Sequence, residues 1–359
     1  MSMDLTVSQY PGATRRVDVV FSQPTVSMRW IEGTTESRHI ESLFLLVDDA
    51  RDAHLSQLLE SFPHLTNKNR VVRYANVKLD QQSPGNSRPR FKQLFRIETR
   101  FIAMGNTSVK LHHRFLTVPQ SQTKRDFNNR DEDHLYTQLE EDDEPERCFA
   151  SAEGALVFIK WQKDEKGHRF FKPTPGMFEN LDLNAPPAID FLIQEAPKMR
   201  PIGSARPQNS FRVQIHLRKS DEDELGHVTN SRYAGLLHDV LTFGLRTGYY
   251  SNGTGASKTE IDLPVIPSRE MITTKDVAVP AGSPFYKRGS VMELYVGYER
   301  ELKVKPEVYV WSWVEPAKID DVYDVIRFEI CSTSESGEEQ VVSLCRAIIK
   351  EDSYQIASL

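Results

Sequence analysis

The sequence predicts an α+β protein in which one unit, a long helix followed by antiparallel strands, occurs twice. Two amphipathic helical patterns, at about 40–59 and 230–245, are each followed by several strand-like runs. Between the two copies lies a segment with seven prolines, 173–207, and this density is typical of an extended connection over a surface. We therefore expect two tandem domains joined by a proline-rich linker.

The first copy is expected within 15–163, and Pro63 ends its helix because proline cannot continue one. An acidic insertion, about 120–147, is expected to be a solvated loop. The apolar face of the helix consists of Ile40, Leu43, Phe44, Val47, Leu55, Leu58 and Leu59. Strands are predicted at 16–21, 25–31, 91–103, 109–118 and 150–161.

The second copy is expected within 208–351, with its helix starting at about Asn230. The apolar face of this helix consists of Tyr233, Leu236, Leu237, Val240, Leu241 and Leu245, and Gly248 is placed to cap its end. Strands are predicted at 211–218, 291–300, 308–314, 324–331 and 341–350, with a hairpin turn around Gly337.

Each helix needs the concave face of a curved antiparallel sheet to bury its apolar side chains. Two such units could pair their sheets edge to edge as a pseudo-dimer, which would cover exposed strand edges. The copies would then be a fused version of a symmetric dimer, and further self-association of the chain is an open alternative.

The composition narrows the class of function. The net charge of −6, from 51 acidic and 45 basic side chains, gives no field that would attract nucleic acid or an anionic membrane. No apolar stretch is long enough to span a bilayer, and the three cysteines form no metal-ligand pattern. We expect a cytoplasmic protein with reduced thiols and no metal or cofactor. A transit segment ending at Arg15 and Arg16 is the alternative.

The segment most informative about chemistry is DEDELGHVTNSRY, residues 221–233, between a strand and a helix of the second copy. Unpaired N–H groups and the dipole at a helix start stabilise negative charge that develops on a carbonyl oxygen. Gly226 lets the backbone approach closely, and Asp223, just before the turn, could attack the carbonyl or deprotonate a water molecule. This arrangement suits attack on a carbonyl group.

The same segment resembles the DxDxxGHVNNxxY signature of hotdog thioesterases. It matches that signature at Asp221, Asp223, Gly226, His227, Val228, Asn230 and Tyr233, and Thr229 replaces the first of the paired asparagines. The resemblance is to the double hotdog acyl-CoA thioesterases, of the 4-hydroxybenzoyl-CoA thioesterase-like superfamily. It implies two tandem hotdog domains, hydrolysis of acyl-CoA, and Asp223 as the nucleophile or general base.

The other residues of the segment have less certain roles on sequence grounds. His227 could orient a water molecule, hold Asp223 or hydrogen-bond the substrate, or it could only tie the turn to the sheet. Asn230 is expected to be the helix N-cap, with positioning of water as a further hypothesis. We expect Gly226 and Val228 to polarise the carbonyl through the backbone and Tyr233 to line a pocket or the core. Asp221 is expected to be solvated.

The first copy has no matching carboxylate. Aligning His39 with His227 places Thr35 where Asp223 stands, so the first copy is predicted to be chemically silent. Asp48 and Asp49, on its helix, are expected to be surface acids, although they could supply a second carboxylate to the other copy.

Two alternatives remain open at this stage. Plant-type acyl carrier protein thioesterases carry an Asp-x-Asn-x-His pattern, in which Leu225 here replaces the asparagine, so an acyl-CoA substrate is favoured. A non-catalytic protein that binds acyl thioesters or acts as a scaffold would also retain such a motif. The sequence does not specify the acyl chain length or the pathway.

Overall fold

The computed structural model divides the 359-residue chain into two compact units. Unit 1 comprises Met1–Thr34, Leu46–Val72 and Val77–Ile189, and unit 2 comprises Thr35–Leu45, Arg73–Asn76 and Asp190–Leu359. The structure describes residues 3–8, 16–21, 37–61, 70–79, 95–104, 108–117, 147–158, 162–163, 169–170, 206–208, 210–223, 226–246, 250, 266–267, 289–304, 308–315, 319–320, 323–334 and 336–351. Most of the acidic insertion and of the proline-rich linker, the predicted strand 25–31 and Gly248 lie outside these residues.

In unit 1 the sheet is antiparallel. Its paired strands are β1 (Met3–Ser8), β2 (Arg16–Phe21), β4 (Phe95–Met104), β5 (Ser108–Thr117) and β6 (Cys148–Phe158). The short strands β7 (Gln162–Lys163) and β8 (Arg169–Phe170) pair separately. β1 and the strand β3 (Arg70–Leu79) were not predicted.

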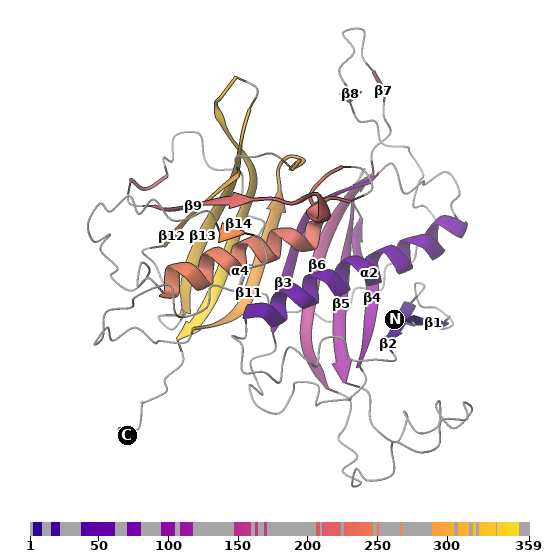
Figure 1. Ribbon diagram of the computed structural model, residues 1–359. Helices are drawn as coiled ribbons and strands as arrows, with labels where there is room; N and C mark the ends of the chain where they lie inside the picture. Colours follow the sequence, from indigo (N-terminus) through magenta and orange to yellow (C-terminus); the bar gives the residue numbers. More distant parts are fainter. Residues whose placement is uncertain are drawn as a thin grey trace, which may run out of the picture. The chain divides into compact units, whose positions relative to one another are not determined.

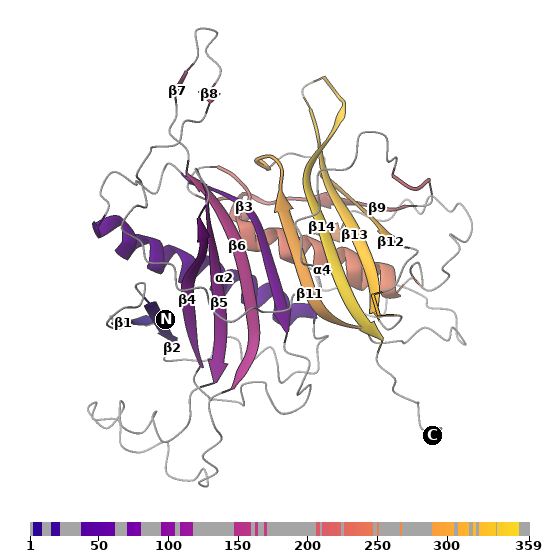
Figure 2. The same ribbon diagram turned by 180° about the vertical axis from the view of Figure 1, so that it is seen from behind.

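The helix α2 (Ser37–Ser61) ends just before Pro63, as predicted. Its residues 46–61 lie across one face of β4, β5 and β6 (Figures 1 and 2). Most of the predicted apolar face is buried, including Ile40, Leu43, Phe44, Val47 and Leu55. The side chains of Leu58 and Leu59 lie outside the described residues.

In unit 2 the sheet is also antiparallel, with the strand order β11-β14-β13-β12-β9. These strands are β9 (Phe211–His216), β11 (Gly289–Tyr298), β12 (Val308–Val314), β13 (Tyr323–Thr333) and β14 (Glu339–Glu351). The short β10 (Ile266–Pro267), which was not predicted, pairs with β9 in parallel. Gly337 has a φ of 83° in the turn between β13 and β14, as the predicted hairpin requires.

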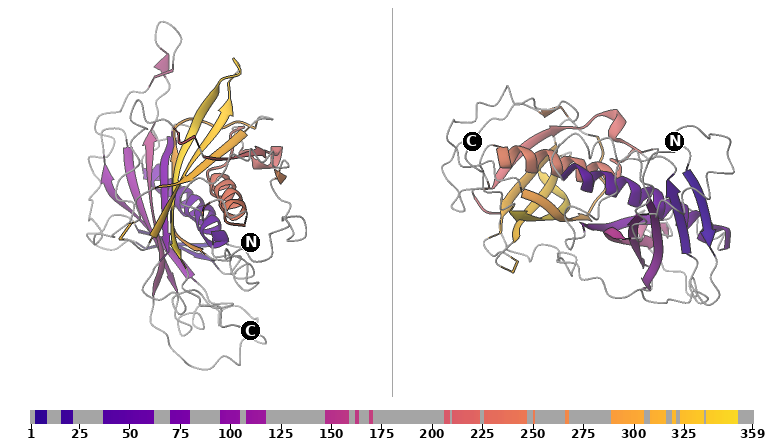
Figure 3. Two further views of the ribbon diagram at one scale, coloured as in Figure 1. Left: turned by 90° about the vertical axis from the view of Figure 1, so that its left-hand side faces the viewer. Right: turned by 90° about the horizontal axis from the view of Figure 1, so that it is seen from below.

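The helix α4 (Asn230–Arg246) lies across this sheet and contacts β9, β11 and β12 (Figures 1 and 3). Alternate residues of β9 and β12 point toward the helix, because successive side chains of a strand point to opposite faces. Val213, Val308 and Val310 are thereby buried against α4, and Phe211 stacks on Phe243 with ring centroids 5.9 Å apart. The predicted core face of α4 is buried at Tyr233, Leu236, Leu237, Val240 and Leu241.

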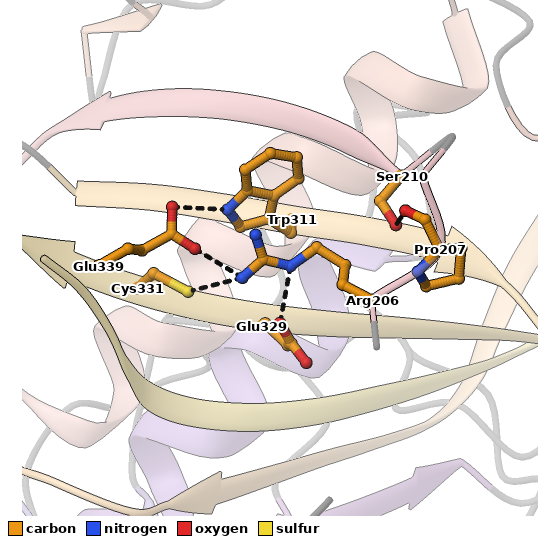
Figure 4. Close-up of polar contacts among 7 residues, drawn as sticks. All are labelled: Arg206, Pro207, Ser210, Trp311, Glu329, Cys331 and Glu339. Carbon is orange, nitrogen blue, oxygen red and sulfur yellow. Dashed lines mark hydrogen bonds and ion pairs between the residues drawn. The ribbon is translucent and has the colours of Figure 1, made fainter. Parts of the chain in front are cut away.

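The residues that precede β9 are held to the outer face of this sheet by Arg206 (Figure 4). Its guanidinium group lies 4.0 Å from the ring centroid of Trp311, and its Nε donates to Glu329 Oε2 at 2.9 Å. Its Nη2 donates to Glu339 Oε1 at 2.6 Å and to Cys331 Sγ at 3.4 Å. Arg206 is therefore the partner of a buried carboxylate, since Glu329 is only 2% exposed.

Replacing Arg206 by methionine should lower the free energy of unfolding by about 2 kcal/mol. Breaking a fully buried ion pair costs roughly 3–5 kcal/mol, and the partial exposure of Arg206 reduces that cost. Denaturant unfolding measures the change. Arg212→Met is the matched control, because Arg212 also stacks on an aromatic ring, 3.8 Å from the Tyr309 centroid, but is exposed. Equal losses in both variants would contradict the role of Arg206.

The pairing of Arg206 with Glu339 also predicts that the stability of the protein depends on pH. Burial alone would raise the pKa of Glu339, but hydrogen bonds from Arg206 and Trp311 outweigh burial and lower this pKa overall. Because the pKa of Glu339 is lower in the folded protein, its charged carboxylate stabilises the fold at pH values above the ordinary pKa of 4.5. This stabilisation is lost as the pH falls below 4.5. The difference in stability between wild type and Arg206→Met should therefore shrink in unfolding experiments below pH 4.5.

Candidate active site

The loop between β9 and α4 is closed by hydrogen bonds within its own backbone. The Asp223 N–H donates to the His227 carbonyl at 2.7 Å, and the Gly226 N–H donates to the Asp223 carbonyl at 3.1 Å. Gly226 has a φ of 77°, which a residue with a side chain rarely adopts. The loop is therefore a defined turn that delivers residues 221–229 to the start of α4.

Asp221 fixes this loop from inside. The side chain is buried and accepts the Arg218 N–H at 2.8 Å, and Arg232 Nε lies 3.4 Å from its other oxygen. Its carbonyl also accepts the Thr229 N–H at 3.0 Å. The prediction that Asp221 is solvated is wrong, because Arg232 on α4 reaches back to pair with it.

Asp223 and His227 lie together, and the structure adds a second carboxylate to them. Asp223 is exposed, and its Oδ1 accepts the backbone N–H of His227 at 3.0 Å. The Nε2 of His227 lies 3.1 Å from Oε2 of Glu301, whose side chain is about half exposed. Glu301 follows β11 and was not identified from the sequence. It is brought close because the Val228 N–H donates to the carbonyl of the next residue, Leu302, at 2.7 Å.

We expected the backbone N–H groups of Gly226 and Val228 to polarise the carbonyl of a substrate, but the structure shows these groups engaged elsewhere. The N–H groups of Gly226, His227 and Val228 already have acceptors within the protein. For the N–H groups of Asn230 and Ser231, at the start of α4, no acceptor lies among the described residues. The first turn of α4 is thus the part of this segment that can present N–H donors to a ligand.

Two further predicted residues lie in the first turn of α4. Asn230 is the first residue of the helix. The N-cap position therefore belongs to Thr229 and not, as predicted, to Asn230. Tyr233 is buried, with its ring edge-on to Tyr298 at a centroid distance of 5.0 Å. Burial is the main cause that raises the pKa of Tyr233, and the charges of Glu301 and Asp223 act in the same direction. Tyr233 is therefore a protonated core residue near both carboxylates.

In the first half, Thr35 lies outside the described residues, as does the side chain of His39. Asp48 is mostly buried, and its Oδ1 pairs with Nη1 of Arg51 at 2.7 Å. Burial raises the pKa of Asp48, and the positive charge of Arg51 opposes this effect. Asp48 is therefore an ion-paired residue of α2, not a solvated surface acid.

Within the described ranges, no three His, Cys, Asp or Glu side chains converge as a metal site would require. None of the helices described above is both long and apolar enough to cross a membrane.

No protein-family model matches the sequence, and no curated protein matches it. Solved structures match it over most of its length. An oleoyl thioesterase (putative) from Lactobacillus plantarum is 14% identical with a TM-score of 0.51, and the match covers 95% of this chain and 98% of that one. An acyl-ACP thioesterase from Bacteroides thetaiotaomicron is 12% identical, with 93% and 98% covered and a TM-score of 0.51.

A 12:0-ACP thioesterase from Umbellularia californica is 11% identical, with 96% and 100% covered and a TM-score of 0.52. At such identities the similarity concerns the fold and not the chemistry. The chain has the hotdog fold of these thioesterases, which confirms the hotdog part of the expected fold.

Replacing the two aspartates one at a time should separate their roles in stability. Asp221→Asn should lower the free energy of unfolding by about 1–3 kcal/mol, because it weakens the hydrogen bonds and ion pair of a buried carboxylate. Asp223→Asn should change it by less than about 0.5 kcal/mol, because the side chain is exposed and an amide oxygen can still accept the His227 N–H. Thermal or denaturant unfolding tests this, and equal effects would contradict the assignment.

Proposed function

We propose that the chain hydrolyses acyl thioesters at the loop between β9 and α4. The observation that carries the proposal is the position of Asp223, an exposed carboxylate in the loop that leads into α4, hydrogen-bonded to the backbone of a histidine that contacts Glu301. A carboxylate next to helix N–H donors is suited to acyl transfer. The shared fold of the solved thioesterases supports this reaction class.

In the proposed mechanism, the thioester carbonyl oxygen faces the N–H groups of Asn230 and Ser231. Asp223 removes a proton from water, and the resulting hydroxide attacks the carbonyl carbon. The N–H groups and the helix dipole stabilise the negative oxygen of the tetrahedral intermediate. The intermediate then expels the thiolate, which takes the proton from Asp223. Direct attack by Asp223, with a mixed anhydride hydrolysed afterwards, is the alternative.

The contact between His227 and Glu301 supports a positioning role for both. Because the His227 backbone N–H binds Asp223 while its ring contacts Glu301, the pair holds the turn that presents the carboxylate. Glu301, about half exposed, also provides a second carboxylate that could hold the attacking water.

We propose acyl-CoA as the substrate, since Leu225 stands where the plant-type carrier-protein thioesterases have asparagine. An acyl carrier protein substrate is the alternative, which the names of two structural neighbours favour. We also propose that 15–163 and 208–351 are tandem hotdog copies that form a pseudo-dimer, with catalysis kept in the second. The repeated order of helix and strands supports this proposal.

Asp223→Asn should lower kcat by roughly two or more decades, because it removes the base while the fold is kept. Hydrolysis of short, medium, long and aromatic acyl-CoAs and of acyl carrier protein thioesters measures the change. Glu222→Gln is the matched control, because this neighbouring carboxylate pairs with Lys219 and should leave kcat nearly unchanged. If no thioester is hydrolysed by the wild type, a binding or scaffolding role replaces the proposed reaction. If hydrolysis persists unchanged in Asp223→Asn, Asp223 is not the base.

Glu301→Gln should lower kcat about tenfold or more, because it removes the charged partner of His227. Glu299→Gln, two residues earlier, serves as the control. The double variant Asp223→Asn with Glu301→Gln should lose less than the product of the two single losses, because both act through the same turn. Independent, multiplicative losses would contradict the coupling through His227.

A further inference from the structure

The outward face of the unit 1 sheet carries a basic group that the proposed reaction does not use. Every second residue of a strand points to the same face. On this face lie Arg96, Glu98 and Arg100 of β4, and His112 and Arg114 of β5. In the register of the two strands, Glu98 lies opposite Arg114 and Arg100 lies opposite His112. The intervening residues, such as Ile97 and Phe115, are buried on the other face.

Arg100 and Arg114 share a single oxygen atom. Nη2 of Arg100 and Nη1 of Arg114 each lie 3.5 Å from Oε2 of Glu98, whereas Arg96 lies 3.3 Å from Oε1. A guanidinium group has five N–H donors, and charge-assisted hydrogen bonds prefer about 2.7–2.9 Å. Because the side chains of Arg100 and Arg114 are 31% and 34% exposed, their remaining donors can be reached from solvent.

His112 provides an independent observation next to these two arginines. Its side chain is buried, at 1% exposure, and neither ring nitrogen has a hydrogen-bond partner within the described residues. Burial, together with the charges of Arg114 and Arg100, lowers the pKa of His112 to about 4, so the ring is neutral at pH 7. A neutral imidazole carries one N–H, which requires an acceptor when it is buried.

Among the residues that the structure describes, none supplies that acceptor. Arginine has no acceptor atom, and Glu153, opposite His112 in the pairing of β5 with β6, lies 3.4 Å from Lys110 Nζ. A ligand that contacts Arg100 and Arg114 could also provide an acceptor for His112.

We propose that Arg100, Arg114 and His112 bind the phosphate group of a phosphate monoester. Phosphate oxygens match the planar fork of guanidinium donors and can accept the imidazole N–H at the same time. The double negative charge of the phosphate matches the two arginines that share one carboxylate oxygen. Glu98 pairs with Arg96 through Oε1, and its other oxygen orders the side chains of Arg100 and Arg114 without using all of their N–H donors.

Isothermal titration calorimetry of the full chain at pH 7 in low-chloride buffer tests this proposal. Inorganic phosphate and adenosine 3′,5′-bisphosphate should both bind, and adenosine, which lacks phosphate, should not. The double variant Arg100→Gln with Arg114→Gln should weaken binding of both phosphates by about tenfold or more, because charge-assisted bonds are lost. No binding of either phosphate, or binding unchanged in this variant, would overturn the proposal.

His112→Phe separates a ligand-binding role from a structural one. Phenylalanine keeps a buried ring, so the variant should remain folded by circular dichroism, whereas phosphate binding should weaken several-fold. Lys110→Gln is the matched control, because Lys110 lies on the same strand and face but is near its own carboxylate on Glu153. If the two variants affect phosphate binding equally, His112 is not part of the site. Because no thioester is used, the outcome is independent of the proposed hydrolysis.

Discussion

The burial of the apolar face of α4 is the constraint on which the candidate site depends. The helix is covered by the inward side chains of β9, β11 and β12, so its first turn has to start near the end of β9. The connecting loop is then short and closes on itself. The hydrogen bond from Val228 to the Leu302 carbonyl ties this loop to the segment after β11, and Glu301 meets His227 as a result.

Two aspartates separated by one residue are placed by the loop in opposite environments. Asp221 is turned inward, where Arg232 and the Arg218 N–H compensate its charge, and it holds the loop in place. Asp223 is turned outward and makes a bond with the His227 backbone that orients it without burying it. A reactive group needs a supporting group that locks its position, and in the proposed mechanism Asp221 gives this support to Asp223.

The sequence predicted those elements whose signals are local. The α4 helix and the β13–β14 hairpin follow from periodicity and from Gly337, and Asp223 and His227 belong to one turn. The strand β3 was not predicted, and in the structure its successive residues Ala75, Asn76 and Val77 are all buried, unlike the alternation of a half-buried strand. Glu301 and the inward position of Asp221 depend on partners from other segments, and no local pattern specifies such partners.

Arg206 has a mechanical consequence for the loop that follows β9. The residues just before β9 are attached through this side chain to carboxylates on β13 and β14, in the middle of the sheet. Tension on the chain that precedes Arg206 is therefore carried by the sheet, in which backbone hydrogen bonds share the load across several strands. Because Arg206 precedes β9 in the chain, a pull from that side meets this anchor before it can reach β9 and the turn at Gly226.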